Sequence, residues 1–323
     1  MDFQPTRDQR DLRAGVRDLL AGRFGREALR AAVDSGTAVD RGLWRELGAA
    51  GFFALRLPEA EGGVGLGLPE AVLVFEEAGR ALLPGPLVAT HLAAGVVPGA
   101  AAGTAVVTAL DLGERGGPLV SYLAEADAVL GAPLLPSGEP VRSADPLTPL
   151  HRVAGDLRGD VSEHRDAGAL LTAALQLGSA LRTVELAVRY AGEREQFGQP
   201  IGAFQAVKHL CAGMLVRAEV ARTAVYAAAV TADAGEIAAA KLLADAAAVR
   251  GARDCLQVYG GMGFTWEADV HLHLKRAWVR AEQWVTAAEA EERLAAELLA
   301  ADPGEADPAA GGLSRIAADA DAP

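Results

Sequence analysis

The chain has 323 residues and, with 30 Lys and Arg against 43 Asp and Glu, carries a formal net charge of −13, which disfavours nucleic acids and anionic membranes as partners. Hydrophobic residues make up 51 %, too many for a disordered chain, yet no uninterrupted apolar run reaches the roughly 18 residues that a transmembrane helix needs. The two cysteines cannot form a disulfide framework, and the charged first residues lack the apolar segment of a signal peptide, so these features together predict a globular cytoplasmic protein.

Residues 1–97 are predicted to form a helical N-terminal domain. Thr6, followed three residues later by Gln9, is a capping box and predicts the start of the first helix. A glycine-rich run over 62–67 lacks the G-x-G-x-x-G spacing of a dinucleotide site and predicts a tight loop between helices. The next helix is predicted over 69–80, with a proline in its first turn.

Residues 98–162 are predicted to form a small middle β domain. Three runs of β-forming residues, over 104–108, 118–122 and 127–130, alternate with Gly, Pro, Ser and Asp. A segment of about 60 residues is too short for a full sandwich or barrel.

Residues 163–300 are predicted to form a C-terminal four-helix bundle. Apolar residues recur every three or four positions over 170–190, 204–233 and 236–259, which is the period of long amphipathic helices. Residues 301–323 have little to bury and are predicted to be a disordered tail. The predicted fold is therefore mainly α, with a small β segment in the middle.

Two features suggest chemistry at first sight but do not support it. His271 and His273 stand two residues apart, so on a helix they point to opposite sides and cannot share a metal ion. Cys211 has His209 nearby but no acidic partner for that histidine, which argues against a nucleophilic thiol. We therefore predict neither a metal site nor a catalytic cysteine.

Two segments of the C-terminal part carry the residue types of a ligand site. In the first, Arg194 ends a long helix close to Phe197, so a guanidinium fork for phosphate stands beside a ring that could contact a base. In the second, Gly260 and Gly261 end another helix, where the missing side chains allow a flat or charged ligand to approach the backbone. On residue chemistry alone, ligand binding and plain helix termination both remain open.

Together with two N-terminal segments, these stretches resemble the acyl-CoA dehydrogenase family. The matching stretches are Leu57-Pro58-Glu59 with Gly62-Gly63, Glu76 to Arg80, Arg194-x-Gln196-Phe197-Gly198 with Phe204-Gln205, and Gln257-x-x-Gly260-Gly261-x-Gly263.

The resemblance implies an N-terminal helical domain, a middle β domain, a C-terminal four-helix bundle, and FAD shared between subunits. It also implies an acyl-CoA or other acyl thioester as substrate and electron-transfer flavoprotein as electron acceptor. In the family, the middle domain of one subunit holds the flavin ring, and the C-terminal domain of a neighbour holds the adenosine and pyrophosphate. The residues implied for this second half are Arg194, Gln196, Phe197, Phe204, Gln205, Gln257, Gly260 and Gly261.

The sequence departs from the family pattern at two points. The middle segment is several dozen residues shorter than a full flavin-holding domain. The family's base, a Glu that takes a proton from the acyl thioester, falls at Trp284 when positions are counted from the glycine pair, and the base position of other relatives falls near Gly168. Glu282 is the remaining candidate for a catalytic base; the alternative is that Glu282 is a solvated charge beside Arg280.

These departures favour one hypothesis over two alternatives. The chain resembles the short, base-lacking subunits of actinobacterial heterotetrameric acyl-CoA dehydrogenases, so we expect a non-catalytic partner in an α2β2 assembly that completes the FAD site of a longer paralogue. The first alternative is a self-sufficient homotetramer with a relocated base, and the second is a flavin-free scaffold or acyl-thioester-binding protein. Fatty, branched, steroid side-chain and carrier-bound acyl groups all remain open as substrates.

Overall fold

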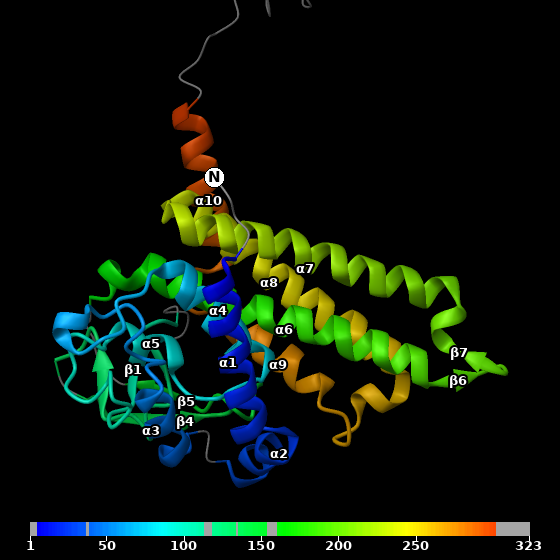
Figure 1. Ribbon diagram of the computed structural model, residues 1–323, viewed down its shortest axis with the longest axis horizontal. Coiled ribbons are helices and arrows are strands. Elements are labelled where there is room, and N and C mark those ends of the chain that lie inside the picture. Colours follow the sequence, from blue (N-terminus) through cyan, green and yellow to red (C-terminus); the bar gives the residue numbers. More distant parts are fainter. Residues whose placement is uncertain (1–4, 37–38, 113–117, 134, 154–159, 302–323) are drawn as a thin grey trace, which may run out of the picture.

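The computed structural model describes residues 5–36, 39–112, 118–133, 135–153 and 160–301 and shows a layer of helices, a small set of strands and a long bundle (Figure 1). Most buried apolar side chains form one continuous core that joins the N-terminal helices to the bundle. This architecture confirms the predicted mainly α fold. The tail over 302–323 lies outside the described residues, and none of the described helices is long and apolar enough to cross a lipid bilayer.

The N-terminal helices begin where their caps predict. The Thr6 side chain accepts a hydrogen bond from the backbone N–H of Gln9, and the Gln9 side chain accepts one from the N–H of Thr6, which is the predicted capping box. The glycine-rich run lies between two helices, again as predicted. The elements of this part are α1 (Arg7–Arg23), α2 (Arg26–Ser35), α3 (Arg41–Ala49), η1 (Glu59–Glu61), α4 (Leu68–Arg80) and α5 (Leu87–Leu92).

Helix α4 connects the N-terminal layer to the bundle. It crosses α6 at a pair of glycines: a Cβ on Gly79 would lie 2.0 Å from the backbone O of Leu175, and a Cβ on Gly178 would lie 1.8 Å from the backbone O of Glu76. Only glycine allows the two backbones to approach this closely. Nine residues of α4, including the carboxylates of Glu76 and Glu77, are buried as a result.

The strands of the middle segment form two small sheets. Strand β1 pairs in parallel with β3, and β5 lies between β2 and β4 in an antiparallel sheet. Each of the three predicted runs overlaps a strand, whereas β4 and β5 were not predicted. The bounds are β1 (Val107–Ala109), β2 (Leu119–Ser121), β3 (Ala128–Leu130), β4 (Gly138–Val141) and β5 (Leu150–Val153).

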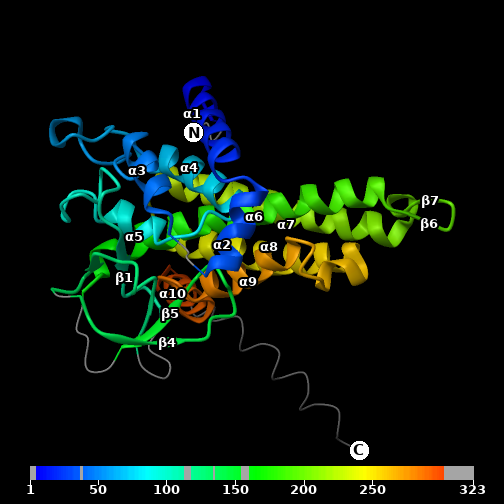
Figure 2. The same cartoon turned by 90° about the horizontal axis from the view of Figure 1, so that it is seen from below.

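The bundle contains the three long helices that periodicity predicts. Helix α6 lies in its centre, packs against α4, α7, α8 and α9, and is buried along most of its length. Figure 2 shows the five strands on one side of the bundle, while a short hairpin, β6–β7, lies at its far end. The bounds are η2 (Ser162–His164), α6 (Arg165–Glu193), β6 (Glu195–Gln196), β7 (Gln199–Pro200), η3 (Ile201–Ala203), α7 (Gln205–Thr231), α8 (Ala234–Tyr259), η4 (Gly260–Phe264), α9 (Val270–Ala281) and α10 (Ala287–Ala301).

Candidate cofactor site and closed base position

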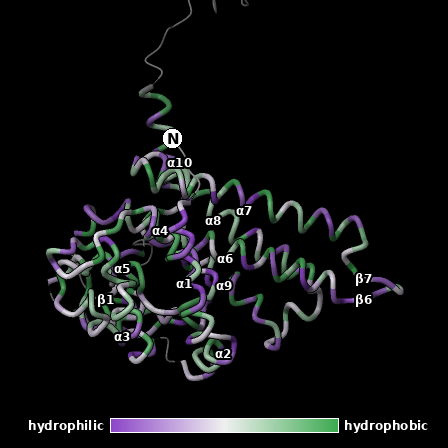
Figure 3. Tube along the Cα trace, viewed as in Figure 1, coloured by the Kyte–Doolittle hydropathy of each residue, from purple (hydrophilic) through white to green (hydrophobic). Residues whose placement is uncertain are grey.

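The first predicted motif forms the β6–β7 hairpin between α6 and α7. Strand β6 pairs with β7 through Gln196 and Gln199, so only Phe197 and Gly198 form the turn. Both turn residues have positive φ, +55° and +78°, as a tight two-residue hairpin turn requires. Arg194 caps α6 immediately before the hairpin and has an exposed side chain. In Figure 3 the β6 strand is coloured as hydrophilic, whereas hydrophilic and hydrophobic residues alternate along the bundle helices.

Phe197 is the most exposed large apolar residue of the described chain. Its side chain is 92 % exposed, and its backbone is in the left-handed region, which is costly for an aromatic residue. Its ring meets that of Phe204 edge to face, with 6.0 Å between centroids, and Gln205 follows as the first residue of α7. The exposed Phe197 and the partly buried Phe204, beside the exposed Arg194 and Gln196, form a surface on which a ring and a phosphate could both rest.

The second predicted motif forms the end of α8 and the η4 turn. Gly260 has φ +58°, and a Cβ built on Gly260 or Gly261 would meet no atom within 4 Å, so the space above both residues is open. Gln257 is exposed one turn earlier on α8. Gly263, in contrast, is required by packing, because its Cβ would lie 2.9 Å from the backbone O of Leu256.

A stacked pair of tyrosines brings the two motifs to the same end of the bundle. Tyr190 lies on the last turns of α6, and Tyr259 directly precedes Gly260; their rings stack 4.1 Å apart with 13° between planes. The structure thus brings together, at one end of the bundle, all eight residues that the sequence assigns to the adenosine and pyrophosphate half of an FAD site. Seven of the eight residues are exposed, and Phe204 is partly buried.

The two positions expected for a base lie against each other in the structure. A Cβ built on Gly168 would lie 2.2 Å from Cδ2 of the Trp284 indole. The indole is 6 % exposed, and its backbone has φ +62°. Trp284 is held there because its backbone N–H donates a hydrogen bond to the backbone O of Asp111 at 2.6 Å. The side chain that replaces the base therefore fills the space that a residue at either position would use.

A cavity of about 30 Å³ remains beside Trp284, between the strands and the helices α6 and α9. Ligand pockets usually measure about 300–1,000 Å³, so a flavin ring does not fit, whereas one or two water molecules do. Three polar side-chain atoms that line it have no hydrogen-bond partner in the described part of the chain: Oδ1 of Asp111, Oγ1 of Thr172 and Nη2 of Arg276. Bound water would supply partners for them.

One carboxyl group and two guanidinium groups line this cavity: Asp111, Arg276 and Arg280. Arg276 is buried and forms an ion pair with Asp145. Burial and the neighbouring Arg276 lower the pKa of Arg280 to about 9. Burial raises the pKa of Asp111 to about 7, although Gln283 donates a hydrogen bond to its Oδ2 at 2.8 Å. Sequence reasoning did not find Asp111, because it lies in a short loop without a motif.

Glu282, the residue named as a possible relocated base, lies outside this cavity. It caps the C-terminus of α9, its side chain is exposed, and it does not line the cavity. The main chain turns between Glu282 and Trp284, so the acid faces solvent while the indole faces inward. No geometry in the structure connects Glu282 with a reacting centre.

The remaining sequence candidates have structural roles. Gly62 ends η1 with φ +81°, and a Cβ on Gly63 would lie 2.0 Å from the backbone O of Leu57, so the glycine loop is fixed by packing. His271 packs edge to face on Trp266, whereas His273 exchanges a 2.7 Å hydrogen bond with Ser179.

Cys211 on α7 shows no sign of activation. Burial and the nearby Asp254 raise the pKa of its thiol, which opposes formation of the thiolate that a nucleophile needs.

Comparison with known proteins identifies the family. Residues 6–108 match the acyl-CoA dehydrogenase N-terminal domain, and residues 162–284 match the acyl-CoA dehydrogenase C-terminal domain. The chain belongs to the acyl-CoA dehydrogenase family. Acyl-CoA dehydrogenases are FAD-dependent oxidoreductases that act on acyl-CoA, which confirms the family and the enzyme class predicted from the motifs.

Individual acyl-CoA dehydrogenases match most of the chain. IpdE2 of Mycobacterium tuberculosis is 36 % identical over 315 residues, which cover 91 % of this chain and 98 % of IpdE2. FadE34 of the same organism is also 36 % identical, over 80 % of this chain but only 44 % of FadE34. Among solved structures, a chain of the ChsE4-ChsE5 complex from M. tuberculosis superposes with a TM-score of 0.79 at 26 % identity, over 92 % of this chain and 99 % of that one. Butyryl-CoA dehydrogenase from Megasphaera elsdenii, at 21 % identity over 93 % and 100 % of the chains, has a TM-score of 0.80 and shares the fold.

Proposed function

We propose that the chain is the non-catalytic subunit of a hetero-oligomeric acyl-CoA dehydrogenase. The contact between Gly168 and the Trp284 indole carries this proposal, because neither residue at the two positions where the family pattern places the base is a carboxylate, and the cavity beside them measures only about 30 Å³. FAD supplies the hydride acceptor for dehydrogenation of the acyl thioester. In this proposal the flavin ring and the base belong to a longer paralogue, and electrons leave through electron-transfer flavoprotein.

The contribution of this chain is the far end of its bundle. Arg194 would pair with the pyrophosphate, Phe197 and Phe204 would flank the adenosine, and Gly260 and Gly261 would let the backbone approach it. The open space above the glycine pair and the 92 % exposure of Phe197 fit this role. The likeness to a chain of a two-protein complex, ChsE4-ChsE5, supports a hetero-oligomer of the α2β2 type.

The test is to express the chain alone and together with a longer acyl-CoA dehydrogenase paralogue, and to measure bound flavin and acyl-CoA-dependent dye reduction. We expect little flavin in the chain alone and a flavin-containing, active complex. Arg194→Ala should lower flavin occupancy of the complex about tenfold at limiting FAD, since a charge-assisted contact is lost. Arg45→Ala, a change of an exposed arginine on α3, is the matched control.

Full flavin occupancy and turnover in the chain alone would refute the partner role. In that case the self-sufficient enzyme remains, and Glu282→Gln tests whether Glu282 is its relocated base. Loss of turnover would identify Glu282 as a relocated base, despite its exposed position. A colourless protein in every combination, unchanged by Arg194→Ala, would instead indicate a flavin-free scaffold.

A further inference from the structure

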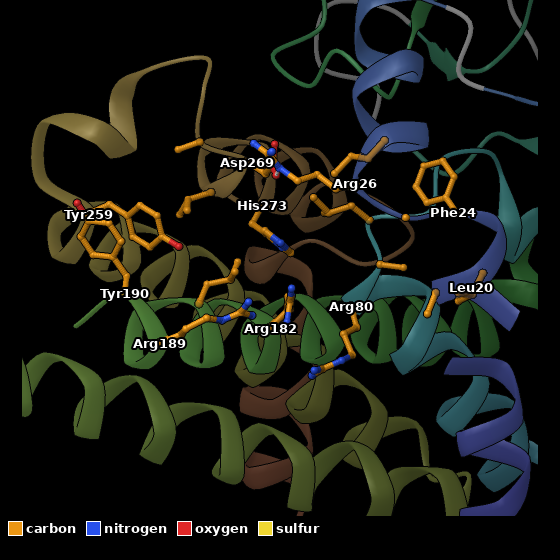
Figure 4. A pocket seen from close by; sticks show the side chains of 18 of the residues that line it. Leu20, Phe24, Arg26, Arg80, Arg182, Arg189, Tyr190, Tyr259, Asp269 and His273 are labelled. Carbon is orange, nitrogen blue, oxygen red and sulfur yellow. Dashed lines mark hydrogen bonds and ion pairs between the residues drawn. The ribbon is translucent and has the colours of Figure 1, made fainter. Parts of the chain in front are cut away.

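A second, much larger cavity lies further along α6, beside the C-terminal half of that helix. It measures about 590 Å³, within the usual range of ligand pockets, and is formed by α1, the start of α2, the end of α4, α6 and the start of α9 (Figure 4). It shares no lining residue with the small cavity beside Trp284. It also contains none of the eight residues proposed to contact FAD, although Tyr259 and Met262, on either side of the glycine pair, line one end of it.

One end of this large cavity is apolar. Leu20 and Phe24 of α1 and Leu29 of α2 line it, and all three side chains are less than 9 % exposed in the folded chain. Figure 4 shows Leu20 and Phe24 at one end of the cavity and the stacked tyrosines, Tyr190 and Tyr259, at the other. The cavity is thus elongated, and its apolar end could cover a hydrocarbon chain.

A row of three arginines connects the two ends. Arg80 comes from α4, and Arg182 and Arg189 come from one face of α6, seven residues or about 10 Å apart (Figure 4). Arg80 and Arg182 share the same carboxylate oxygen of Glu185, which lies outside the lining. Arg189 has no ion-pair partner within the part of the chain that the structure describes. The row therefore has more positive charge than its neighbouring carboxylate can balance.

Among the described residues, the other carboxylates of the cavity form no ion pair with Arg182 or Arg189. Glu77 pairs with Arg13 and Arg17 and lies 3.8 Å from Arg80, and Asp269 pairs with Arg26 and Arg30. Glu267 is also among the lining residues, but its side chain is exposed to solvent.

A buried histidine in the wall of the cavity, His273, lies close to the same arginines. His273 is 3 % exposed, and its Nδ1 is engaged with Ser179. Burial, together with the nearby Arg182 and other arginines, lowers the pKa of His273 to about 3. The ring is therefore neutral at physiological pH and adds no charge of its own.

We propose that this cavity binds an elongated amphipathic anion, in which a carboxylate or phosphate head contacts Arg182 and Arg189 and an apolar chain lies against Leu20, Phe24 and Leu29. Guanidinium forks suit both head groups, because each presents paired oxygens. The apolar walls favour a ligand with a hydrocarbon tail over a bare inorganic anion.

The test is calorimetric titration of the full chain with dodecanoate and with dodecyl phosphate, each below its micellar concentration. We expect binding of at least one, and the preferred ligand shows whether the site suits a carboxylate or a phosphate. Arg182→Ala and Arg189→Ala should each weaken that binding about tenfold. Arg189 is exposed, so its removal leaves the fold intact, and thermal unfolding of both variants checks this.

Three controls make the result decisive. Arg7→Ala removes an exposed arginine elsewhere on α1 and should leave binding unchanged. Dodecyl maltoside has the same chain without the charge, and inorganic phosphate has the charge without the chain; both should bind far more weakly. Absence of binding, equal binding of dodecyl maltoside, or unchanged affinity in the folded Arg182→Ala and Arg189→Ala variants would each overturn the proposal.

Discussion

Asp111 joins the loop after β1 to the segment that follows α9. Its backbone O accepts a hydrogen bond from the backbone N–H of Trp284, and its Oδ2 accepts one from the side-chain amide of Gln283. Asp111 therefore fixes both Trp284 and the residue before it. The other carboxylate oxygen, Oδ1, is buried without a hydrogen-bond partner among the described residues. Such a group is costly when ionised, which is why its pKa is raised to about 7.

Asp111→Asn should therefore change stability in a pH-dependent way. The pKa of Asp111 in the folded state lies above its unfolded value near 4. The free energy of unfolding therefore falls as the pH rises from about 4 to 7 and this carboxyl ionises. The amide has no charge and can still accept from Gln283. We expect the variant to be more stable than the parent by roughly 4 kcal/mol at pH 8 and equal to it near pH 4, as measured by denaturant unfolding. A constant difference between the two proteins across this range would contradict the assignment.

Helix α1 is attached to α4 by charge as well as by apolar contact. Arg13 contacts both Glu76 and Glu77, Arg17 contacts Glu77, and the two carboxylates are only 1 % exposed. The hydroxyl of Tyr226 on α7 donates to Glu76 at 2.7 Å, so the cluster links three helices. Burial alone would raise the pKa of Glu77, but hydrogen bonds from Arg17 and Arg13 bring it below its ordinary value.

Glu77→Gln should loosen α1 from α4. It leaves Arg13 and Arg17 without their shared carboxylate, and breaking such a buried pair costs about 3 kcal/mol. Because the lowered pKa of Glu77 stabilises the fold above the unfolded value, this contribution is lost as the pH falls through the folded pKa. We expect lower stability at pH 7, with the difference shrinking in acid. Asp11→Asn, on the exposed side of α1, is the matched control, and an equal loss in both variants would refute the argument.

Elements could be predicted from the sequence where their pattern is long. The helices α6, α7 and α8 each repeat apolar residues over more than six turns, so their period is unambiguous. Strands β4 and β5 have four residues each and no alternating burial, and β4 contains a proline, so nothing local distinguishes them from loops.

The candidate site, too, could be predicted only where its residues are close in sequence. The hairpin and the glycine pair could be found because their residues are neighbours in sequence. The contact between Gly168 and Trp284, and the row of arginines from α4 and α6, depend on the packing of distant segments, which the sequence pattern does not reveal.

On the scale of the whole molecule, several large apolar side chains of the bundle are exposed to solvent. Phe197, Phe264 and Trp266 are 92, 78 and 60 % exposed, and Val216 and Val220 lie one turn apart on the outer face of α7. Exposed apolar clusters of this kind mark contact surfaces. They stand at the same end of the bundle as the proposed cofactor contacts, or along α7.

We therefore expect hydrogen exchange of this chain to slow on complex formation with the longer paralogue. Protection should be concentrated in the β6–β7 hairpin, in η4 and along α7, whereas α3 and the sheet of β2, β4 and β5 should be unchanged. The comparison is made by mass spectrometry on the free chain and the complex. Protection confined to the β strands would show that the partner binds elsewhere and would contradict the proposed arrangement.

The contact between Gly168 and Trp284 also constrains how the chain can evolve. A Trp284→Glu change alone would empty the space of an indole beside Gly168, a loss on the order of 3–5 kcal/mol, and would place a carboxylate in a nearly closed interior. A Gly168→Glu change alone would drive its Cβ into the indole. Each single change lowers stability. A carboxylate at either position would therefore need a compensating change at the other.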